Sequence, residues 1–423
     1  MAPRLFSRPV VVIGGGIVGL TLAQALKKAD IPCVVYERDY ALETEKGGGW
    51  AITIHWALKA LEDCLPGDLF ARLIDIQVDP EQGIKDTGRF LFLNMATLEP
   101  KYEIPPSKRM RVNRRLLRML LAEGIDIKYG KSLTRIEIEE MAGTATVHFT
   151  DSSSVKTNLI IGCDGSNSIT RHLLFQSQNA SARSQLNQLP IRAMGLTMRL
   201  SPSQIDPLRA IDPLLFQGCH PETGSFLWYS TVSAPPLNGS DRTASPYYEG
   251  QLIMSWRHQS ASDDVPSTDE QRRQKMRNLV NPFHPILRTA IEDVPEGIEI
   301  KEIRLLDWPT QPWPNHDNHV TLAGDAAHAM TMYRGEAFNH GVTDAANLAK
   351  QLLRVRDGDV ELKDAIANYE SEILARTHDA VLLSRQACLD AHDLSNLHTD
   401  SPLVSKRARV LESARQIAYP TSN

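Results

Sequence analysis

Pro9 to Asp39 reads PVVVIGGGIVGLTLAQALKKADIPCVVYERD, and this pattern predicts a strand, a glycine turn, a helix and a second strand. The first strand is the β-branched run Val10 to Ile13, and the second is Val34 to Tyr36. Glu37 stands at the end of the second strand, about 20 residues after the glycines, as in folds that bind dinucleotides. The chain is therefore expected to open with a βαβ unit.

The three glycines of this turn, spaced Gly14-x-Gly16-x-x-Gly19, have separate tasks. Gly14 allows a tight turn, Gly16 lets the backbone approach a pyrophosphate, and Gly19 lets the helix pack closely on the strand. The helix N-terminus offers free N–H groups and a partial positive charge to phosphates. Glu37 is expected to accept hydrogen bonds from a ribose. The motif predicts a Rossmann-type nucleotide site, without a choice between NAD and FAD.

The composition of the 423-residue chain limits its class. Hydrophobic residues make up 42% and charged residues 23%, which is typical of a globular protein with a sizeable core. Lys plus Arg is 46 and Asp plus Glu is 51, so the net charge of −5 argues against a nucleic-acid binder. Five cysteines without a CxxC pair indicate reduced thiols. Without a leader or a long apolar run, we expect a cytoplasmic protein that does not span a membrane.

A basic helix is predicted in the segment 109–124, RMRVNRRLLRMLLAEG. Arg114 stands near its start, and a guanidinium fork there suits the oxygen atoms of a diphosphate. Arg115 and Arg118 follow in the same helix, and we interpret them as a solvated basic face. In the C-terminal region we interpret the charges of Arg376 and Arg385 in the same way.

Two aspartates directly follow predicted buried strands. Asp164 comes after the strand at 159–162, and Asp325, preceded by Gly324, comes after the strand at 320–323. In open α/β sheets, ligands bind at the carboxyl ends of the strands. Asp325 is therefore expected to accept hydrogen bonds from a sugar-like chain.

Residues 176–300 change character, because loops and short strands alternate there without the helix–strand repeat of a nucleotide fold. We expect a mainly antiparallel domain inserted into that fold. The period of two places Arg192 on the apolar face of one strand, and Tyr229 lies in another. An unpaired buried charge is costly, so Arg192 needs a partner or an anionic ligand. The alternative is that Arg192 and Tyr229 form a structural pair that holds two strands together.

The glycine motif with Glu37, the Asp164-Gly165 element and the Gly324-Asp325 pair occur in one order. Together they resemble the FAD-dependent class A aromatic monooxygenases of the salicylate-hydroxylase-like kind, and within them the fungal secondary-metabolism branch. The resemblance covers about residues 9–385. It implies an α/β protein with a Rossmann-type FAD-binding domain, an inserted mainly antiparallel β-sheet substrate domain, C-terminal helices, and no separate NAD(P)H domain.

The expected domain boundaries divide the chain into six segments. The FAD-binding domain takes 1–80, 106–180 and 306–360, the substrate domain takes 81–105 and 181–305, and the C-terminal helical region takes 361–423.

The resemblance also implies roles for single residues. The residues implied for the ADP part of FAD are Gly14, Gly16, Gly19, Glu37 and Arg38. Arg114 falls in an arginine-then-leucine helix motif, Asp164 is linked to both FAD and NAD(P)H, and Gly324 with Asp325 holds the ribityl side. The residues expected beside the isoalloxazine ring are Gly335, Ala337, Phe338 and Asn339, and Gly49 from an earlier glycine loop is counted among the cofactor residues.

The chain departs from the family pattern in the loop beside the flavin. The family usually has proline where this chain has Met332, and glycine where it has Ala337, so this loop is expected to be less rigid and bulkier. The sequence leaves open whether His55, Met332 or Tyr333 contacts the substrate. For His55 we favour a packed residue at a helix entry.

The expected reaction is the hydroxylation of a phenol-like or polyketide-type aromatic molecule. NADPH or NADH would reduce FAD, O2 would form a C4a-hydroperoxide, and the substrate would attack its distal oxygen. Arg192 is expected to stabilise a phenolate, and Tyr229 to orient it or relay a proton. No metal is expected, because no His/Cys cluster has ligand spacing.

Three alternatives remain open. The first is a flavin epoxidase or Baeyer–Villiger-type oxygenase. The second is a flavoprotein cyclase without redox turnover, which a lack of NAD(P)H oxidation would favour. The third is a non-catalytic nucleotide-binding protein, which a lack of bound cofactor would favour. The sequence does not indicate an oligomeric state.

Overall fold

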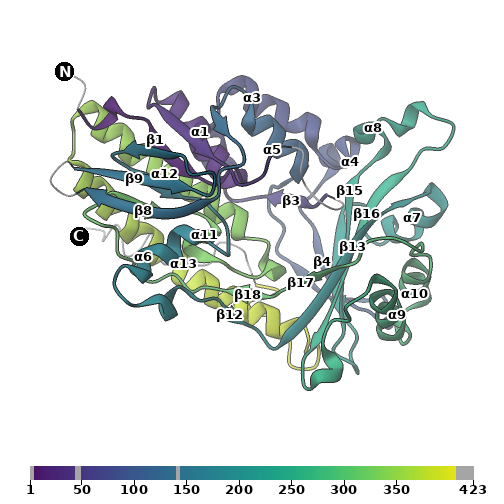
Figure 1. Ribbon diagram of the computed structural model, residues 1–423. Helices are drawn as coiled ribbons and strands as arrows, with labels where there is room; N and C mark the ends of the chain where they lie inside the picture. The colour runs from purple at the N-terminus through teal and green to yellow at the C-terminus, as the bar shows by residue number, and fades with distance from the viewer. Residues whose placement is uncertain (1–3, 43–48, 140–142, 406–423) are drawn as a thin grey trace, which may run out of the picture.

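The computed structural model describes residues 4–42, 49–139 and 143–405. Two sheets dominate it (Figure 1): a five-stranded parallel sheet and a seven-stranded, mainly antiparallel sheet. Figure 1 shows the smaller sheet on the left, among the long helices, and the larger sheet on the right. This is the predicted α/β class with a separate substrate-sheet unit. Within the described residues, no helix has the length and apolar character needed to cross a membrane.

The five-stranded sheet is assembled from distant parts of the chain. Its strands, in spatial order, are β19 (Val320–Leu322), β11 (Ile160–Gly162), β1 (Val10–Ile13), β2 (Cys33–Tyr36) and β7 (Ile127–Lys128). Every pair is parallel. Strands β19, β11 and β1 are buried along their whole length, as expected for a parallel sheet covered on both faces. Their carboxyl ends therefore meet at one edge.

The first glycine turn has the backbone geometry that its sequence predicts. Gly14 has a φ of 109°, which favours glycine, and its N–H donates to the carbonyl of Tyr36 at 2.8 Å. Helix α1 (Ile17–Lys28) begins immediately after Gly16. A Cβ on Gly19 would lie 2.1 Å from the carbonyl oxygen of Gly14, so only glycine permits this approach of helix and strand.

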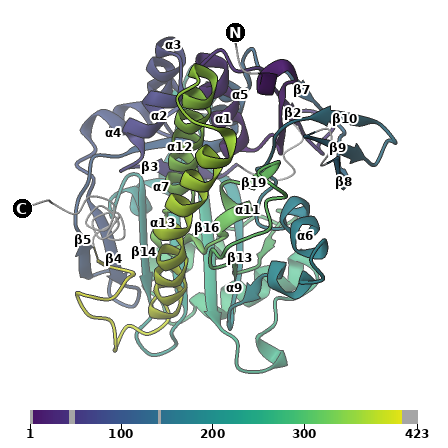
Figure 2. The ribbon, with the colours of Figure 1, turned by 90° about the vertical axis from the view of Figure 1, so that its left-hand side faces the viewer.

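Two long helices stand against this sheet. Helix α12 (Ala337–Asp357) packs on α1, and α13 (Leu362–Asp390) packs on α12, as the neighbouring green and yellow helices of Figure 2 show. The shorter helices of this half are α2 (Leu58–Cys64), α3 (Gly67–Ala71), α4 (Pro80–Lys85), α5 (Arg114–Ala122), α6 (Ile169–Gln176) and α11 (Asp325–His328). The predicted C-terminal helical region is helical to Asp390, and 406–423 lie outside the described residues.

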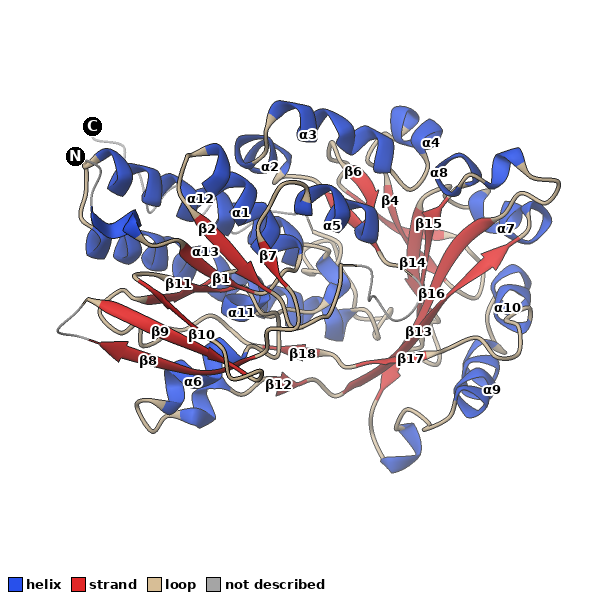
Figure 3. Cartoon of the chain, turned by 45° about the horizontal axis from the view of Figure 1, so that its top comes forward, coloured by secondary structure: helices blue, strands red, loops and turns tan. Residues whose placement is uncertain are grey.

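Three short sheets complete the framework. One of them is the antiparallel pair β8 (Leu133–Glu139) and β9 (Thr144–Phe149), with β10 (Ser154–Thr157) beside β9. The ladder of β12 (Asn187–Gln188) with β18 (Leu306–Asp307) lies between the large sheets (Figure 3). The other ladder pairs β3 (Ala51–Ile54) with β6 (Met110–Asn113).

The seven-stranded sheet combines two separate segments of the chain. In spatial order its strands are β17 (Lys301–Ile303), β13 (Ile191–Leu200), β16 (Tyr248–Arg257), β15 (Phe226–Ser233), β14 (Leu215–Cys219), β4 (Phe90–Asn94) and β5 (Pro100–Ile104). Only the pair of β14 and β4 is parallel among these described strands.

The interpretation of 176–300 as strands and loops missed its helices. The helices there are α7 (Pro202–Arg209), α8 (Pro235–Asn238), α9 (Asp269–Val280) and α10 (Pro285–Glu292). Helix α9 is strongly polar, with Arg273, Met276 and Val280 buried, so its apolar period is easily missed. Together α7, α9 and α10 cover one face of the large sheet and enclose a core with it.

We expect Gly19→Ala to destabilise the protein by about 1–3 kcal/mol, because the added methyl group would overlap the Gly14 carbonyl. Urea unfolding of the purified apoprotein measures this. Gly67→Ala is the control, because a Cβ there meets no atom within 4 Å, and its stability should change little. Equal stability of the Gly19→Ala protein would contradict the close helix–strand contact.

Candidate functional site

The carboxyl edge of the parallel sheet opens into a cavity of about 560 Å³, called here the nucleotide cavity. The predicted nucleotide-binding residues that line it are Gly14, Gly16, Glu37, Arg38, Arg114 and Asp164. A Cβ on Gly16 would meet no protein atom within 4 Å, so space is open directly at the N-terminus of α1. Gly19 lies behind this surface, where it packs on Gly14.

The carboxylate of Glu37 is buried and held by backbone amides. Its Oε2 accepts from the N–H of Gly15 at 2.6 Å, and its Oε1 accepts from the N–H of Asp39 at 2.9 Å. A carboxylate has about four lone-pair sites, so two backbone bonds leave acceptor capacity for a ribose. The local fold thus orients Glu37 toward the cavity that it lines.

Arg118 corrects the interpretation of its helix as a solvated basic face. Its side chain is buried, its Nε donates to the carbonyl of Gly15 at 2.9 Å, and its Nη2 lies 3.4 Å from Asp39. Arg118 therefore braces the glycine turn and lines the nucleotide cavity. A signal was present in the sequence, because positions four apart share one face of a helix and Arg114 was already assigned to the site. Arg115 is exposed, as predicted.

Asp164 uses its carboxylate within its own turn. Its Oδ1 accepts from the hydroxyl of Ser168 at 2.5 Å, and its Oδ2 accepts from the N–H and hydroxyl of Thr170 at 2.9 and 3.0 Å. These bonds hold the start of α6 and the turn at Gly165, which has a φ of 80°. Asp164 thus shapes the wall of the cavity that it lines.

A second cavity, of about 240 Å³, lies where β3, the strands β15 and β16 and the segment 330–338 meet. We call it the aromatic cavity, because Trp50, Trp228 and Phe338 line it together with Met330 and Met332. Three residues expected beside the isoalloxazine ring also line it: Gly335, Ala337 and Phe338. Its polar lining residues include Thr53, Arg111, Gln251 and Glu336.

Asn339, also expected beside the isoalloxazine ring, instead ties segments together behind that cavity. It is fully buried, and its Oδ1 accepts from the N–H of His55 at 3.0 Å. Its Nδ2 donates to the carbonyls of Thr53 at 3.1 Å and Gly335 at 3.2 Å. The His55 ring lies 3.3 Å from the carbonyl of Gly335, which is a packed position of the kind favoured from the sequence.

The glycine loop that ends at residues 49–50 and the segment 332–333 both contribute residues to the aromatic cavity. Gly49 accepts from the hydroxyl of Thr197 at 3.3 Å, and Trp50 next to it lines the aromatic cavity, while Gly47 and Gly48 lie outside the described residues. Met332 lines the aromatic cavity. Tyr333 is buried and donates from its hydroxyl to Ser255 at 2.8 Å.

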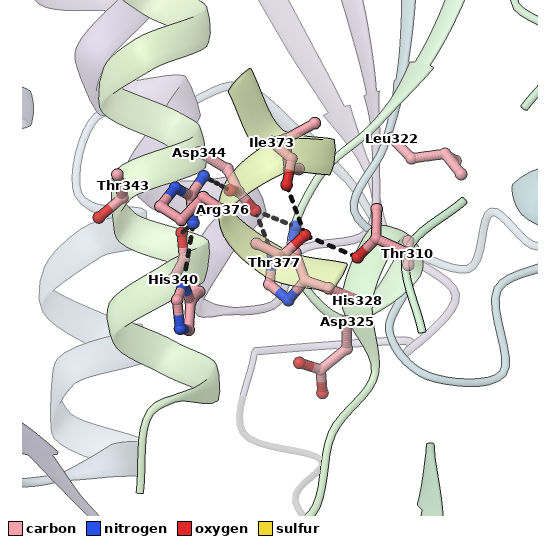
Figure 4. Close-up of polar contacts among 12 residues, drawn as sticks. Thr310, Leu322, Asp325, His328, His340, Thr343, Asp344, Ile373, Arg376 and Thr377 are labelled. Carbon is pink, nitrogen blue, oxygen red and sulfur yellow. Dashed lines mark hydrogen bonds and ion pairs between the residues drawn. The ribbon is translucent and has the colours of Figure 1, made fainter. Parts of the chain in front are cut away.

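Sequence reasoning missed a buried charge network beneath Gly324 (Figure 4). Asp344 Oδ2 accepts from the N–H of Gly324 at 2.8 Å and from Nε2 of His328 at 2.6 Å, while its Oδ1 accepts from Arg376 at 2.6 Å. Arg376 also donates to Nδ1 of His340 at 2.9 Å. Burial alone would raise the pKa of Asp344, but the charges of His328 and Arg376 outweigh it and lower that pKa well below its ordinary value.

Asp325 stands beside this network, with its carboxylate directed away from it in Figure 4. Burial raises the pKa of Asp325, and the charges of His328 and Arg114 oppose that rise. Gly324 before it has a φ of 63°, and its Cβ would lie 3.1 Å from Val18 of α1. The loop is thus pressed against α1.

The interpretation of Arg376 as a solvated charge was wrong, whereas Arg385 keeps 34% of its side chain exposed but is paired with a buried acid. Arg376 is 1% exposed and bonds to Asp344 as described above. Arg385 makes two bonds of 2.7 Å to the fully buried Asp307. Both arginines lie on α13, and the interpretation failed because the partners of this helix are distant in sequence.

The structure does not bring Arg192 and Tyr229 to the aromatic cavity. Tyr229 packs on Phe216 in the core that faces α7, α9 and α10, and its hydroxyl lies 3.1 Å from Thr231. Arg192 donates to Asp264 at 3.0 Å near the surface. The alternation of faces was predicted correctly, but it places both residues on the face opposite Trp228. They are not partners of each other either.

Comparison with known proteins agrees with this arrangement. Residues 107–384 match the family model described as an FAD binding domain. The chain is 50% identical over 408 residues to the FAD-dependent monooxygenase dbaB of Emericella nidulans, covering 96% of this chain and 95% of that protein. This chain belongs to the FAD-dependent monooxygenases. It is an oxidoreductase with FAD as its cofactor, and the predicted resemblance to the fungal branch of the class A enzymes is confirmed.

Other FAD-dependent monooxygenases extend the comparison. The enzyme cctM of Talaromyces islandicus is 33% identical over 408 residues, covering 95% of this chain and 97% of that one. The fold matches 2,6-dihydroxypyridine-3-hydroxylase of Arthrobacter nicotinovorans with a TM-score of 0.71 at 17% identity, over 94% and 96% of the two chains. It matches Klebsiella pneumoniae HpxO, in complex with FAD and uric acid, with a TM-score of 0.68 at 19% identity, over 97% and 92%.

The residues of the nucleotide cavity fit the FAD of this monooxygenase family. The open space at Gly16 and the N-terminus of α1 suit a pyrophosphate, and Arg114, Arg118 and Lys131 supply positive charge around it. The aromatic cavity, lined by Trp50, Trp228 and Phe338, suits a flat ring system. The protein thus offers groups suited to the charged part and to the aromatic part of the cofactor.

We expect Asp344→Asn to lower the free energy of unfolding by about 3–5 kcal/mol, because it removes the fully buried carboxylate that pairs with Arg376 and His328. FAD affinity should fall too, since the Gly324 loop loses its support. Chemical unfolding and flavin-fluorescence titration measure the two effects.

Glu372→Gln is the matched control for this substitution. Glu372 binds the same Arg376 at 2.7 Å, but its side chain is 39% exposed, so the loss should stay within about 1 kcal/mol. Equal stabilities of the two variants would contradict the importance of the buried pair.

We expect Arg192→Ala to keep its FAD and most of its turnover, because Arg192 contacts Asp264 on the far face of the sheet. Flavin content and substrate-dependent oxygen uptake measure this. If the variant holds FAD but loses hydroxylation, the role predicted from the sequence is correct and the inference from its position is not.

Proposed function

We propose that this enzyme uses NADPH or NADH and O2 to hydroxylate a phenol-like or polyketide-type aromatic molecule in secondary metabolism. The observation that carries the proposal is the aromatic cavity, which lies between the substrate sheet and the start of α12. Its walls combine three aromatic side chains and two methionines with a few polar groups. Such walls suit a flat aromatic ligand that needs orientation by a small number of polar contacts.

When bound, FAD accepts a hydride and activates O2, which is chemistry that no side chain of the protein can supply. The N-terminus of α12 would stabilise negative charge on the reduced ring, because Ala337 and Phe338 begin this 21-residue helix and line the cavity. Glu336, just before them, carries a negative charge, but Nε of Arg334 donates to it at 2.6 Å and compensates that charge. The N-terminus of α12 therefore keeps a net positive potential that favours negative charge on the reduced ring.

The apolar side chains around the cavity would exclude water from the reacting groups. Met332 and Ala337, the two departures from the family pattern, both line this cavity. The space beside the flavin ring therefore differs from that in members with proline and glycine at these positions. We infer that the substrate differs in shape from theirs.

Two solved relatives support the type of substrate. One is named a hydroxylase of 2,6-dihydroxypyridine, and another holds uric acid together with FAD. Both ligands are flat rings that carry oxygen substituents. By analogy of fold, we propose a ring of this kind for the present enzyme.

Stopped-flow reduction of the flavin-loaded enzyme by NADH and NADPH, with and without a panel of phenols, tests the proposal. We expect one phenol class to accelerate reduction by about 10-fold or more, with one hydroxyl group added per O2 consumed. Asp325→Ala is the companion variant, and it should purify largely without flavin.

Two outcomes would contradict the proposed reaction, and a third would contradict the role of Asp325. A flavin-loaded enzyme that neither nicotinamide reduces would point to a flavoprotein without redox turnover. Oxygen insertion into an alkene or a ketone alone would point to an epoxidase or a Baeyer–Villiger-type oxygenase. An Asp325→Ala protein that keeps its full flavin would refute the ribityl role.

A further inference from the structure

A third cavity, of about 190 Å³, lies on the large sheet and is called here the sheet cavity. Its lining residues include Thr197 of β13, Gln251 of β16 and Lys301 of β17. Trp50 lines it from the segment before β3. Trp50 and Gln251 also line the aromatic cavity, so the two cavities adjoin at these two residues.

The aromatic cavity alone is small for an extended aromatic ligand. Its volume is about 240 Å³, below the about 300–1,000 Å³ of pockets that enclose a drug-sized ligand. Three of the residues expected beside the isoalloxazine ring line it, so the flavin ring borders this space. The reacting ring of a substrate can lie there, whereas further rings need additional space. The sheet cavity offers that space next to it.

Gln251 stands where the two cavities adjoin, and it has an unused hydrogen-bond donor. The residue is 5% exposed, and its Oε1 accepts from the hydroxyl of Ser230 at 3.4 Å. Its Nε2 has no hydrogen-bond partner among residues 4–42, 49–139 and 143–405, yet it is not sealed from solvent as both amide atoms of Gln217 are. A buried donor without an acceptor lowers stability. This donor is accessible to a molecule in the cavities.

Trp50 supplies a second donor at the same place. Its indole N–H has no acceptor within the part of the chain that the structure describes. The indole groups of Trp256, Trp308 and Trp313, by contrast, donate to protein oxygens at 2.7–3.1 Å. An indole nitrogen donates and never accepts, and the acceptor of the Gln251 amide is already used by Ser230. Such donors match an oxygen that only accepts, as the oxygen of a ring carbonyl does.

The sheet cavity also has a polar part that reaches solvent. Lys301 and Glu299 both line it and form an ion pair of 3.8 Å, and their side chains are 34% and 59% exposed. Burying a polar group without a partner is costly. Polar substituents on the far end of a ligand can avoid that cost here, because they can keep contact with water and with these charges.

We propose that the substrate has two or more fused rings and spans both cavities. Its reacting ring would lie in the aromatic cavity and its far ring in the sheet cavity. A carbonyl oxygen between them would accept from Nε2 of Gln251 and from the N–H of Trp50. The inference rests on the proposed function, since it names the substrate class of the same site. Gln251 thus determines specificity, because a site built to hydrogen-bond one group rejects an analogue that lacks it.

Calorimetric titration of the FAD-loaded enzyme with three probes tests the role of Gln251. The probes are 2-hydroxyfluorenone, with three fused rings and a ketone, 2-hydroxyfluorene, with the same rings and no ketone, and the single-ring ketone 3-hydroxyacetophenone. In the wild type we expect 2-hydroxyfluorenone to bind at least about 10-fold more tightly than either of the others. In Gln251→Met the preference for the ketone over 2-hydroxyfluorene should fall below about 2-fold, with the affinity for 2-hydroxyfluorene equal or higher.

Thr197→Phe tests the sheet cavity itself. Thr197 lines this cavity and does not line the aromatic cavity, so a phenyl ring there would fill only the far space. We expect the affinity for 2-hydroxyfluorenone to fall at least about 10-fold, because its far ring loses its place. The affinity for 3-hydroxyacetophenone should stay within about 2-fold of the wild type.

Gln217→Met is the matched control for the change at Gln251. Gln217 is a glutamine of β14 in the same sheet, it is fully buried, and it lines neither cavity. All three affinities should therefore stay within about 2-fold of the wild type. Flavin content and the temperature of unfolding are measured for every variant, and Gln251→Met and Thr197→Phe should keep both near the wild-type values.

Several results would overturn the inference. They are a ketone preference that survives in Gln251→Met, a loss of FAD from that variant, an equal loss of one-ring and three-ring binding in Thr197→Phe, and a wild type that binds none of the probes. The proposed function is judged separately by flavin reduction. An enzyme that neither nicotinamide reduces, but whose ketone preference depends on Gln251, would retain this inference and lose the monooxygenase reaction.

Discussion

The carboxylate of Asp344 joins four segments that meet under the cofactor site. It receives hydrogen bonds from the backbone after β19, from His328 of α11 and from Arg376 of α13, while Asp344 itself belongs to α12. A charge buried this deeply must be matched by donors in one geometry, so the four segments can only assemble together. The position of Asp325 and the start of α12 follow from that assembly. The start of α12, which lines the aromatic cavity, thus depends on one buried interaction.

The nucleotide cavity and the aromatic cavity suit different parts of a large, amphipathic cofactor, and the aromatic cavity also has room for a second ligand. The nucleotide cavity is rich in positive charge and backbone donors, and the aromatic cavity is lined mainly by rings and methionines. Arg114 lines the nucleotide cavity, and it lies near enough to Asp325 for its positive charge to lower the pKa of that acid. The large sheet contributes Trp228, Gln251 and Ile253 to the second cavity, so substrate contacts come from a separate unit of the fold. Specificity can therefore vary without disturbing the nucleotide site.

Local patterns predicted the nucleotide half well. Gly14 and Gly19 have the geometry that their spacing requires, and Glu37 lies at the cavity at the end of its strand. The substrate half was predicted correctly only to the level of alternating strand faces. Alternation shows which residues share a face, but which face meets the flavin depends on how the sheet docks. Arg192 was therefore assigned to the cavity, and Arg111, which comes from a strand of the other unit, was overlooked.

The sequence by itself determined the βαβ unit, the FAD family and the places where the chain returns to the parallel sheet. These features depend on residues within about 30 positions of one another, where backbone geometry decides. Only the tertiary structure decided that Arg118 and Arg376 are buried, that Asp344 is the buried acid that pairs with Arg376, and that Trp228 rather than Tyr229 lines the aromatic cavity. The physical reason is that the burial of a charge is set by partners from distant segments. Sequence spacing carries no information about such partners until the elements have packed.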